Sequence, residues 1–392
     1  MSTSNDAPLV FLVAGESSGD LLGASVMRAI SLKTQGVAKF AGIGGPEMAE
    51  AGLKSEFPMQ DLAVMGVFEV MPRLPLLLKR IKETADAVER LQPDVLVTID
   101  APDFCFRVIK KLKARGAKVP CVHFVAPSVW AWRPGRAKKV AKFLDHLLCL
   151  LPFEPKYFER EGLASTFVGH PVVESEIGQG DGAAFRERHA IASDAQLLSV
   201  LPGSRTGEVE RLAPVFGEAV AKLAAQYPNL HIVVPAVEHL SDLVRTVTKD
   251  WAAPVSVIGG EEKAGAFAAS DAALAASGTV ALELAMAGLP NVIGYKLNGL
   301  TAMLAKRLLK TPYVNLINIV LEREAVPELL QDDCTAEGLA REVARLFDDK
   351  HAREAQRAAA HQAMKQLGLG GPSPGERAAD VVLSYVEDKG DN

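Results

Sequence analysis

The chain has few aromatic residues, no surplus of basic residues and no apolar run long enough to cross a bilayer. Only 6% of its 392 residues are aromatic and its formal net charge is -5. Nucleic-acid-binding domains are usually basic, so a DNA or RNA partner is not expected. The apolar runs are shorter than the roughly 20 residues that a membrane-spanning helix needs. With 48% hydrophobic and 23% charged residues, the composition is that of an ordinary globular protein.

Cysteines and metal-ligand patterns are also scarce. The four cysteines form no C-x-x-C pair and no zinc spacing, so reduced and buried thiols are expected. No D-x-D pair or His/Cys cluster accompanies the acidic residues, so we predict neither a metal nor another cofactor. No basic region precedes the first apolar stretch, which predicts a first strand and a cytoplasmic protein. The cysteines are Cys105, Cys121, Cys149 and Cys334.

Short apolar runs alternate with helical patterns over most of the chain. This alternation predicts α/β domains, in which helices cover both faces of a parallel sheet. The pattern lapses between Pro171 and Asp194, where glycine and polar residues indicate a linker. We therefore expect two Rossmann-like, doubly wound domains that face one another across a cleft. Their predicted extents are residues 1–172 and 190–350, followed by C-terminal helices and a tail over residues 351–392.

Ligands of such sheets bind beyond the carboxyl ends of the strands, and two glycine-containing loops stand out there. AGESSGDLLGA contains Gly15 and Gly19 before a helix, but it matches neither the dinucleotide motif nor the P-loop, which disfavours an NAD enzyme or a P-loop NTPase. LPGSRTGEVE offers backbone donors at Gly203 and Ser204, and Arg205 adds a two-pronged cation suited to a diphosphate. An ordinary turn with a surface arginine fits the same spacing equally well.

A third loop, ASGTVALELAMAG, has a similar pattern. Ser277, Gly278 and Thr279 are expected to cap a helix and to expose its first N–H groups. Glu283 follows Thr279 by one helical turn on the same face, where a carboxylate can accept both hydroxyls of a ribose. The alternative is an ordinary glutamate on a helix surface.

Two carboxylates close the most apolar strand of the first half, in TIDAPDF. Asp100 lies where a general base would be wanted, and Asp103 fits an N-cap equally well. His123 and His170 are the histidines nearest to strand ends, and a packing or loop role is favoured for each. The tryptophans of APSVWAW could wall an acyl or sugar pocket or anchor a helix to the sheet. These tryptophans are Trp130 and Trp132.

Taken in order, these loops resemble the lipid-A-disaccharide synthases, inverting glycosyltransferases of the GT-B fold. The matching stretches lie between about residue 10 and residue 330 and are AGESSGDLLGA, GIGGPEM, LAVMGVFEV, IDAPDF, APSVWAW, LPFE, VGHP, LPGSR with EVE, ASGTVALE, GYK, and AKRL with TPYVNLINI. The family implies that UDP-2,3-diacylglucosamine and 2,3-diacylglucosamine 1-phosphate form a β-1,6-linked disaccharide and release UDP. Inversion in one metal-independent displacement needs a base for the acceptor hydroxyl and groups that offset the charge of the leaving UDP.

The resemblance also implies roles for individual residues. The candidate base falls on Asp100 and the phosphate-contacting arginine on Arg205. The loop around Gly15, Glu16 and Ser17 would line the acceptor side in the first domain, and the second domain would bind the UDP-sugar. The nucleotide-side residues are Ser277, Gly278, Thr279, Glu283 and Asn318. The chain departs from the family pattern at two positions, Cys105 and Ala126, where asparagine and serine are expected.

The segment VFEVMPRLPLLLKR, residues 67 to 80, is unusually apolar for a chain with no membrane span. If both substrates carry acyl chains, such a surface edged by cations would enter the membrane interface. A core helix is the commoner fate of an apolar run, but Pro72 and Pro75 weigh against a regular buried helix. We therefore expect residues 64–82 to associate peripherally with the inner face of the inner membrane. The cations are Arg73, Lys79, Arg80 and Lys82, and the expected membrane contacts are Val67, Phe68, Leu74 and Leu77.

Two other functions stay open. A nucleotide-sugar 2-epimerase of the same fold would act on water-soluble substrates and would not need the apolar segment. A non-catalytic, peripheral lipid-binding module would leave the two nucleotide-side loops without a role. The expected partners are the UDP-linked acylated amino sugar, the acylated sugar phosphate and the membrane surface. A homodimer through the C-terminal helices is left open, because no clear heptad supports it.

Overall fold

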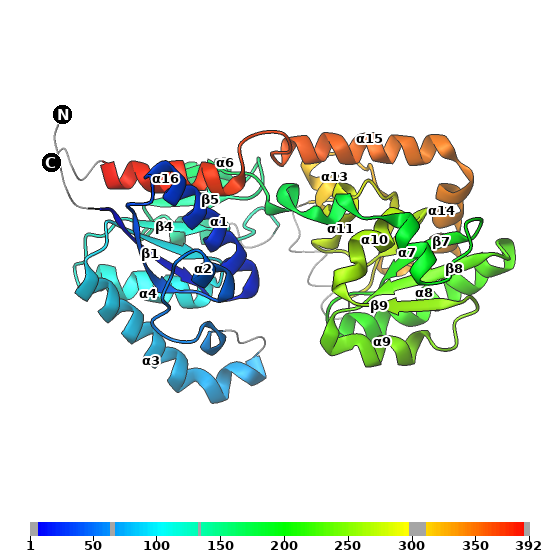
Figure 1. The fold of residues 1–392 in the computed structure, drawn as a ribbon, viewed down its shortest axis with the longest axis horizontal. Coiled ribbons are helices and arrows are strands. Elements are labelled where there is room, and N and C mark those ends of the chain that lie inside the picture. The colour runs from blue at the N-terminus through cyan, green and yellow to red at the C-terminus, as the bar shows by residue number, and fades with distance from the viewer. Residues whose placement is uncertain (1–6, 63–66, 132–134, 298–310, 388–392) are drawn as a thin grey trace. The chain divides into compact units, whose positions relative to one another are not determined.

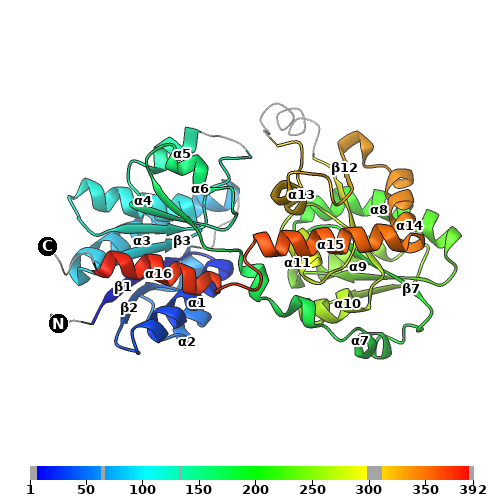
Figure 2. The same cartoon turned by 90° about the horizontal axis from the view of Figure 1, so that it is seen from above.

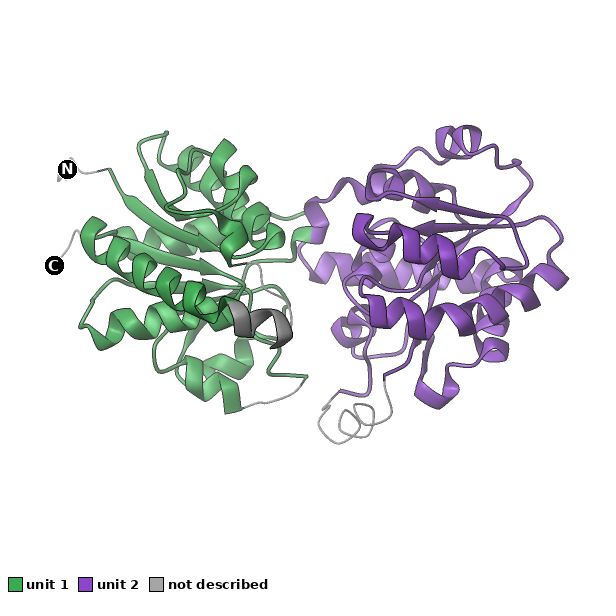
Figure 3. Ribbon diagram, turned by 90° about the horizontal axis from the view of Figure 1, so that it is seen from below, with its two compact units in different colours: residues 1–171, 370–392 green, residues 172–369 purple. Residues whose placement is uncertain are grey.

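A computed structural model of the chain describes most of its residues. Backbone and side chains are described for residues 7–62, 73–131, 135–297 and 311–387, and the backbone alone for residues 67–72. The chain divides into two compact units, unit 1 with residues 1–171 and 370–392, and unit 2 with residues 172–369 (Figure 3). Each unit contains a six-stranded sheet in which all neighbouring strands are parallel. The predicted α/β fold with two Rossmann-like sheets is therefore confirmed.

The sheet of unit 1 has the strand order β2-β1-β3-β4-β5-β6 (Figure 1). Its strands are β1 (Leu9–Ala14), β2 (Lys39–Ile43), β3 (Val95–Ile99), β4 (Cys121–Phe124), β5 (His146–Cys149) and β6 (Ala164–Phe167). β1 and β3 are continuous apolar runs, as expected of strands that are buried on both faces of a parallel sheet. The strand order reverses between β1 and β3, which is where ligands of doubly wound sheets bind.

The helices of unit 1 come from both ends of the chain. They are α1 (Ser17–Lys33), α2 (Pro46–Glu50), α3 (Val67–Leu91), α4 (Pro102–Ala114), α5 (Gly135–Val140), α6 (Pro155–Glu159) and α16 (Pro374–Glu387). Helix α16 lies beside α1 in both Figure 1 and Figure 2. A Cβ atom at Gly375 would lie 2.1 Å from Ser25 Oγ, so glycine allows this close approach. The final helix thus belongs to unit 1, whereas the helix before it belongs to unit 2.

Helix α3 contains the unusually apolar segment and runs without interruption from Val67 to Leu91. Pro72 and Pro75 weigh against such a helix in the sequence, but both fall within its first three turns. Each proline removes one backbone hydrogen bond there, and the long remainder of the helix keeps its own. Among the described residues, no helix is long and apolar enough to cross a membrane.

The sheet of unit 2 has the order β12-β11-β10-β7-β8-β9. Its strands are β7 (Gln196–Leu201), β8 (Leu230–Pro235), β9 (Val255–Ile258), β10 (Ala272–Ala275), β11 (Asn291–Tyr295) and β12 (Glu328–Leu330). Read from β9, this is the order of dinucleotide-binding folds, and it reverses between β7 and β10. The helices are α7 (Gly182–Arg188), α8 (Thr206–Gln226), α9 (Ser241–Thr248), α10 (Lys263–Ala269), α11 (Val280–Met286), α13 (Leu316–Leu321), α14 (Ala336–Asp348) and α15 (Lys350–Gln366).

The segment predicted as a linker contains helix α7, so that prediction was wrong in part. The side chain of Phe185 is buried in a small core with Ile191, and α7 packs on α10. Gly180 lies so close to α10 that a Cβ atom would be 2.0 Å from the carbonyl oxygen of Ala264. Because glycine makes this contact with its backbone, the packing leaves no apolar pattern in the sequence.

Candidate functional site

The loop after β1 is held rigidly at the switch point of unit 1. A Cβ atom at Gly15 would lie 2.7 Å from Cβ of Ala101, so this loop touches the loop that follows β3. Asp20, which is 2% exposed, accepts hydrogen bonds from the N–H groups of Gly45 at 2.7 Å and Met48 at 3.1 Å. The carboxylate therefore joins the AGESSGD loop to the start of α2. Sequence reasoning missed Asp20, although it is the last residue of that motif.

Asp100 has a left-handed backbone at the carboxyl end of β3. Its φ is 48° and that of Ala101 is 42°, conformations that cost free energy for residues other than glycine. The N–H group of Asp100 donates to the carbonyl oxygen of Phe124 at 2.9 Å, which fixes the turn to β4. Burial and the charge of Asp100 raise the pKa of Glu16, in that order. Two carboxylates thus share the rim of this sheet.

Asp103 lies exposed in the first turn of α4, and the N-cap of that helix is Ala101. The alternative prediction of an N-cap role for Asp103 was therefore wrong. The strained turn at Ala101 itself ends β3 and begins α4. Residue preferences do not predict this turn, because alanine seldom adopts a left-handed backbone. Cys105 is fully buried in the next turn, where burial raises the pKa of its thiol. All four cysteines are free and buried, as predicted.

Of the two histidines near strand ends, His123 is buried and His170 is partly buried. His123 is fully buried in β4, with its Nδ1 atom 2.8 Å from Thr98 Oγ1 and its ring edge-on to Phe106. Burial lowers the pKa of His123 to about 3 and that of His170 to about 4. Both rings are therefore neutral near pH 7, and the environment of His123 matches the packing role.

Trp130 is an anchor for the loop after β4. Its indole N–H group donates to Glu154 Oε1 at 3.1 Å, and its ring meets Phe153 edge to face. Glu154 is 3% exposed and also accepts the N–H groups of Leu150 and Leu151 at 3.1 and 3.0 Å. Burial nevertheless raises the pKa of Glu154 to about 7. Sequence reasoning missed this buried carboxylate of the LPFE motif, and Trp132 lies outside the described residues.

In unit 2, a cavity of about 340 Å³ lies at the carboxyl ends of β7, β8 and β10. It therefore opens at the switch point of this sheet, where ligands of doubly wound folds bind. The structure brings both predicted loops to its wall. The predicted residues in the wall are Gly203, Ser204, Ser277, Gly278, Thr279 and Glu283. Three charged residues that sequence reasoning missed complete the lining, namely Glu208, Glu238 and Lys263.

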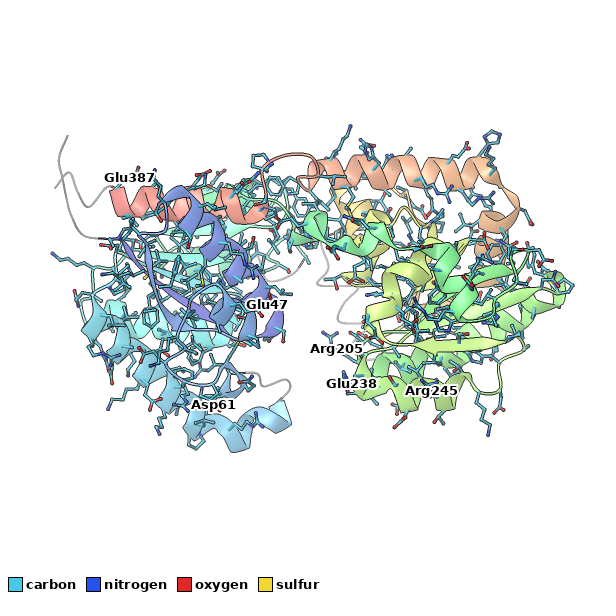
Figure 4. All side chains as sticks on the ribbon, in the orientation of Figure 1. Glu47, Asp61, Arg205, Glu238, Arg245 and Glu387 are labelled. Atoms are coloured by element: carbon cyan, nitrogen blue, oxygen red, sulfur yellow. The ribbon has the colours of Figure 1, made fainter. Side chains whose placement is uncertain are left out.

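Arg205 is the N-cap residue of α8, and its side chain is 74% exposed. Figure 4 shows Arg205 and Glu238 at the same edge of unit 2. The guanidinium donates from Nη1 to Glu208 Oε1 at 3.1 Å. Glu208 Oε2 accepts the N–H group of Ser204 at 3.2 Å, and Oε1 also accepts the hydroxyl of Tyr295 at 3.4 Å. The carboxylate of Glu208 thus accepts hydrogen bonds from the donors of the LPGSR loop.

A second ion pair crosses the cavity wall. Nζ of Lys263, the first residue of α10, bonds Glu283 Oε2 on α11. The ammonium also lies 5.7 Å from the centroid of the Phe267 ring. The lysine is the third residue after the apolar run VSVIGG, so inspecting the residues after every strand would have found it.

Asn318 is fully buried and is not part of the cavity wall. Its amide donates to the carbonyl oxygen of Val326 at 2.8 Å and to Glu328 Oε1 at 2.7 Å. Glu328 in turn accepts the N–H group of Val314 at 2.9 Å, and the Val314 carbonyl accepts the hydroxyl of Ser277 at 3.2 Å. Asn318 is thus connected to the cavity only through other residues.

The apolar segment of α3 has one exposed edge. Leu74 is 37% and Leu78 is 51% exposed, and the two residues lie one turn apart. Leu77 instead packs against the core of unit 1. Arg80 is bound to Asp61 at 2.6 Å and lies 4.4 Å from the centroid of the Phe57 ring, so this predicted membrane cation is held by unit 1. The side chains of Val67 and Phe68 lie outside the described residues.

No group of three or more histidine, cysteine, aspartate or glutamate side chains that could hold a metal occurs within the described parts of the chain. Unit 1 presents two carboxylates at a strained strand end, Asp100 and Glu16, and burial together with the charge of Asp100 raises the pKa of Glu16. Unit 2 instead offers backbone N–H groups and Lys263 in the wall of a cavity, with Arg205 outside the wall and bonded to the wall residue Glu208, and this arrangement suits an anion attached to a polar group.

Known proteins match the chain over nearly its full length. A profile of the family described as lipid-A-disaccharide synthetase matches residues 10–375. The lipid-A-disaccharide synthase of Rhodospirillum centenum is 54% identical over 379 residues, covering 96% of this chain and 94% of that protein. The one of Paramagnetospirillum magneticum is 52% identical over 380 residues, covering 96% and 97%. The S. aureus MnaA-UDP co-structure has a TM-score of 0.65 at 11% identity and covers 98% of this chain and 97% of that one, a likeness of fold alone.

Proposed function

The chain belongs to the lipid-A-disaccharide synthase family, and from this premise we propose which of its residues perform each part of the reaction. It is a GT-B glycosyltransferase of lipid A biosynthesis. The substrates that follow from this activity are UDP-2,3-diacylglucosamine as donor and 2,3-diacylglucosamine 1-phosphate as acceptor. The products are the β-1,6-linked disaccharide 1-phosphate and UDP.

Unit 2 binds the UDP part of the donor in the cavity beside β7 and β10. Arg205 and the N–H groups of the loop that contains Ser204 contact the diphosphate, because a guanidinium and backbone donors together favour a doubly charged oxyanion. Glu283 accepts the ribose hydroxyls. The support for this assignment is that the cavity wall combines two loops that are about 75 residues apart in the sequence. This is the observation on which the proposal depends most.

The remaining nucleotide-side residues divide into two kinds. Ser277, Gly278 and Thr279 contact the nucleotide directly from the cavity wall. Asn318 acts as a positioning residue, because its hydrogen bond to Glu328 holds the segment to which the Ser277 hydroxyl is bonded. Lys263 adds a second cation near the diphosphate once the ribose has engaged Glu283.

Unit 1 binds the acceptor and supplies the base. Gly15, Glu16 and Ser17 line the acceptor side, and Asp100 takes the proton of the acceptor 6-hydroxyl. The hydroxyl oxygen attacks C1 of the donor sugar as the bond from C1 to the diphosphate oxygen breaks, so the anomeric configuration inverts in one step. Base assistance of this kind contributes roughly 10²–10⁴-fold. Arg205 stabilises the negative charge that develops on the departing UDP.

Helix α3 contacts the inner face of the inner membrane through its exposed edge. Leu74 and Leu78 enter the acyl boundary, and the exposed ammonium groups of Lys79 and Lys82 meet anionic headgroups. Val67 and Phe68, the other two expected membrane contacts, have side chains that lie outside the described residues. Leu77 supports the helix from the core side, so it does not belong to the contact itself.

One experiment tests the activity. The purified chain is mixed with both lipid sugars in detergent micelles, and the release of UDP is measured together with the disaccharide product. UDP release that requires both substrates supports the proposal. Conversion of UDP-N-acetylglucosamine to its 2-epimer would show a nucleotide-sugar epimerase instead, and lipid binding without any release of UDP would show a non-catalytic module.

A further inference from the structure

Glu208 occupies the anion-binding groups of the LPGSR loop. All three polar atoms bonded to its carboxylate are donors, namely the N–H of Ser204, the guanidinium of Arg205 and the hydroxyl of Tyr295, at 3.1 to 3.4 Å. The carboxylate also fills the space above Gly203, where a Cβ atom would lie 2.7 Å from Glu208 Oε2. These are the features that admit a phosphate group to the start of a helix.

We propose that Glu208 is an internal competitor for the diphosphate of UDP. In the free enzyme its carboxylate occupies the donors of the LPGSR loop, and on UDP binding it turns away from these donors. This inference rests on the proposed function, because it assumes that the diphosphate binds at this loop. It adds a residue that sets how tightly UDP is held and how readily it leaves.

The competition follows from charge and geometry. A carboxylate and a phosphate cannot accept the same N–H groups together, and two anions at contact distance repel each other strongly in a partly buried site. The side chain of Glu208 is only 12% exposed, whereas that of Arg205 is 74% exposed. Arg205 therefore has room to follow the incoming phosphate, while Glu208 has to leave its place against Gly203.

Competition of this kind assists turnover at the end of the reaction. UDP is the product that the cations hold most strongly, and the returning carboxylate replaces it on the same donors. The carboxylate of Glu208 then pairs with Arg205 again, so the guanidinium does not have to be rehydrated when UDP leaves. The enzyme thus holds UDP less tightly than its donors alone would allow, and product inhibition is weaker.

The test is UDP binding by calorimetry to wild type, Glu208→Gln and Glu208→Ser. Glutamine suits the third position of a helix as well as glutamate does, so α8 retains its start. We expect both variants to bind UDP roughly three- to tenfold more tightly, because an ion pair exposed on one side has been removed as a competitor. Binding of uridine, which has no phosphate, should stay unchanged. In the assay with both lipid sugars, UDP should inhibit Glu208→Gln at correspondingly lower concentrations.

The matched control is Glu210→Gln, which removes the same charge from the exposed side of the same helix two residues later. It should leave UDP affinity within twofold of wild type, which shows that net charge alone is not responsible. UDP affinity that is unchanged or weaker in Glu208→Gln and Glu208→Ser, at an unchanged melting temperature, overturns this inference and makes Glu208 an orienting residue for Arg205. A wild-type chain that does not bind UDP at all overturns the proposed donor site as well.

Discussion

The switch points of the two units share an architecture but differ in their chemistry. In unit 1 the strand ends carry Asp100 and Glu16, beside a backbone in the left-handed region. In unit 2 they carry backbone donors together with Arg205 and Lys263 around a cavity. Both sheets are parallel and doubly wound, so the difference comes entirely from the loops that follow the strands.

The titration behaviour of the carboxylates follows the same division. In unit 1 burial raises the pKa of Glu16, with Asp100 contributing, and it raises the pKa of Glu154 to about 7. In unit 2 two carboxylates of the cavity wall are paired with cations, Glu208 with Arg205 and Glu283 with Lys263. A raised pKa favours taking up a proton, whereas paired cations favour exchanging one anion for another. This difference supports the proposal that unit 1 takes up the acceptor proton and unit 2 binds UDP.

The comparison is tested most severely by Asp100→Asn. Removing the proposed base should lower kcat by roughly 10²–10⁴-fold, while UDP affinity stays within twofold because the proposed UDP site is in unit 2. Steady-state assays with both lipid sugars give kcat, and calorimetry gives the UDP affinity of the same preparation.

The matched control for this variant is Asp103→Asn, which removes the same charge from an exposed position of α4. It should keep near wild-type turnover. A turnover of Asp100→Asn close to that of wild type would remove Asp100 from the mechanism. A fall of many degrees in its melting temperature would instead mean that the carboxylate holds the strained turn together.

The next largest effect concerns the cations and carboxylates of unit 2. Arg205→Ala and Glu283→Ala should each weaken UDP binding by about 1.5 to 3 kcal/mol, the range of hydrogen bonds to charged groups. Calorimetry with UDP measures the loss, and the melting temperature shows whether the unit stays folded. Glu283→Ala also leaves Lys263 without the ion pair that it has in the free chain.

Arg245→Ala is a suitable control for Arg205→Ala. It removes an arginine from an exposed position of α9 in the same unit, and it should not change UDP affinity. If UDP bound equally well to wild type, Arg205→Ala and Glu283→Ala, the nucleotide would have to bind elsewhere, and the contrast between the two switch points would lose its meaning.

Much of this contrast could be predicted from the sequence. The apolar runs predicted the six strands of unit 1 and all strands of unit 2 except β12, and the loops of Asp100, Arg205 and Glu283 follow those strands. Spacing alone predicted that Ser204 and Ser277 would lie at strand ends, because parallel strands bring such loops to one edge of a sheet. The structure then shows that both residues share the wall of one cavity.

Other features depend on contacts that a sequence does not display. Asn318 is bonded to Glu328 of β12, and Glu154 is bonded to Trp130 of the loop after β4, so the residues next to them in the chain do not predict these contacts. The bond between Lys263 and Glu283 joins two helices through tertiary packing. The left-handed turn at Ala101 contradicts residue preference, because alanine seldom adopts it, and the surrounding sheet imposes it.

The membrane contact would extend the comparison, because it assigns the lipid interface to unit 1 alone. Leu74→Ser with Leu78→Ser should weaken binding to anionic liposomes by about 2 kcal/mol, since each leucine is only partly exposed and contributes part of its full transfer free energy. Sedimentation with vesicles that contain phosphatidylglycerol measures this loss, and the melting temperature should stay unchanged.

Leu32→Ser with Val37→Ser is the matched control, because these residues are 79% and 56% exposed in unit 1 away from α3. It should leave sedimentation unchanged. Equal loss in both double variants would mean that apolar exposure in general, and not the edge of α3, determines the association. A double variant of α3 that unfolds would place Leu74 and Leu78 in the core.

The last predicted effect is a pH dependence of stability that belongs to unit 1. Glu154 has a pKa of about 7 in the folded chain and an ordinary value of about 4.3 in the unfolded chain. Between these values the folded state holds one more proton than the unfolded state. The contribution of Glu154 to the free energy of unfolding is therefore fully present below pH 4.3 and falls by about 1.4 kcal/mol per pH unit as the pH rises toward 7.

Glu154→Gln should abolish this slope, so the difference in stability between wild type and variant should shrink or reverse as the pH rises from 5 to 6.5. Urea unfolding followed by tryptophan fluorescence in a Trp251→Phe background reports on unit 1, because the other two tryptophans are Trp130 and Trp132.

Glu262→Gln in unit 2 is the control. The pKa of Glu262 is lowered, first by the hydrogen bond from Arg188. Its contribution to the free energy of unfolding is therefore lost only as the pH falls below the ordinary pKa of a glutamate. The slope of stability against pH between pH 5 and 6.5 should not change in Glu262→Gln. Parallel pH profiles for wild type and Glu154→Gln would show that Glu154 is ionised throughout, held so by Trp130 and the two backbone N–H groups, and that raised carboxylate pKa values are not a general property of the unit 1 rim.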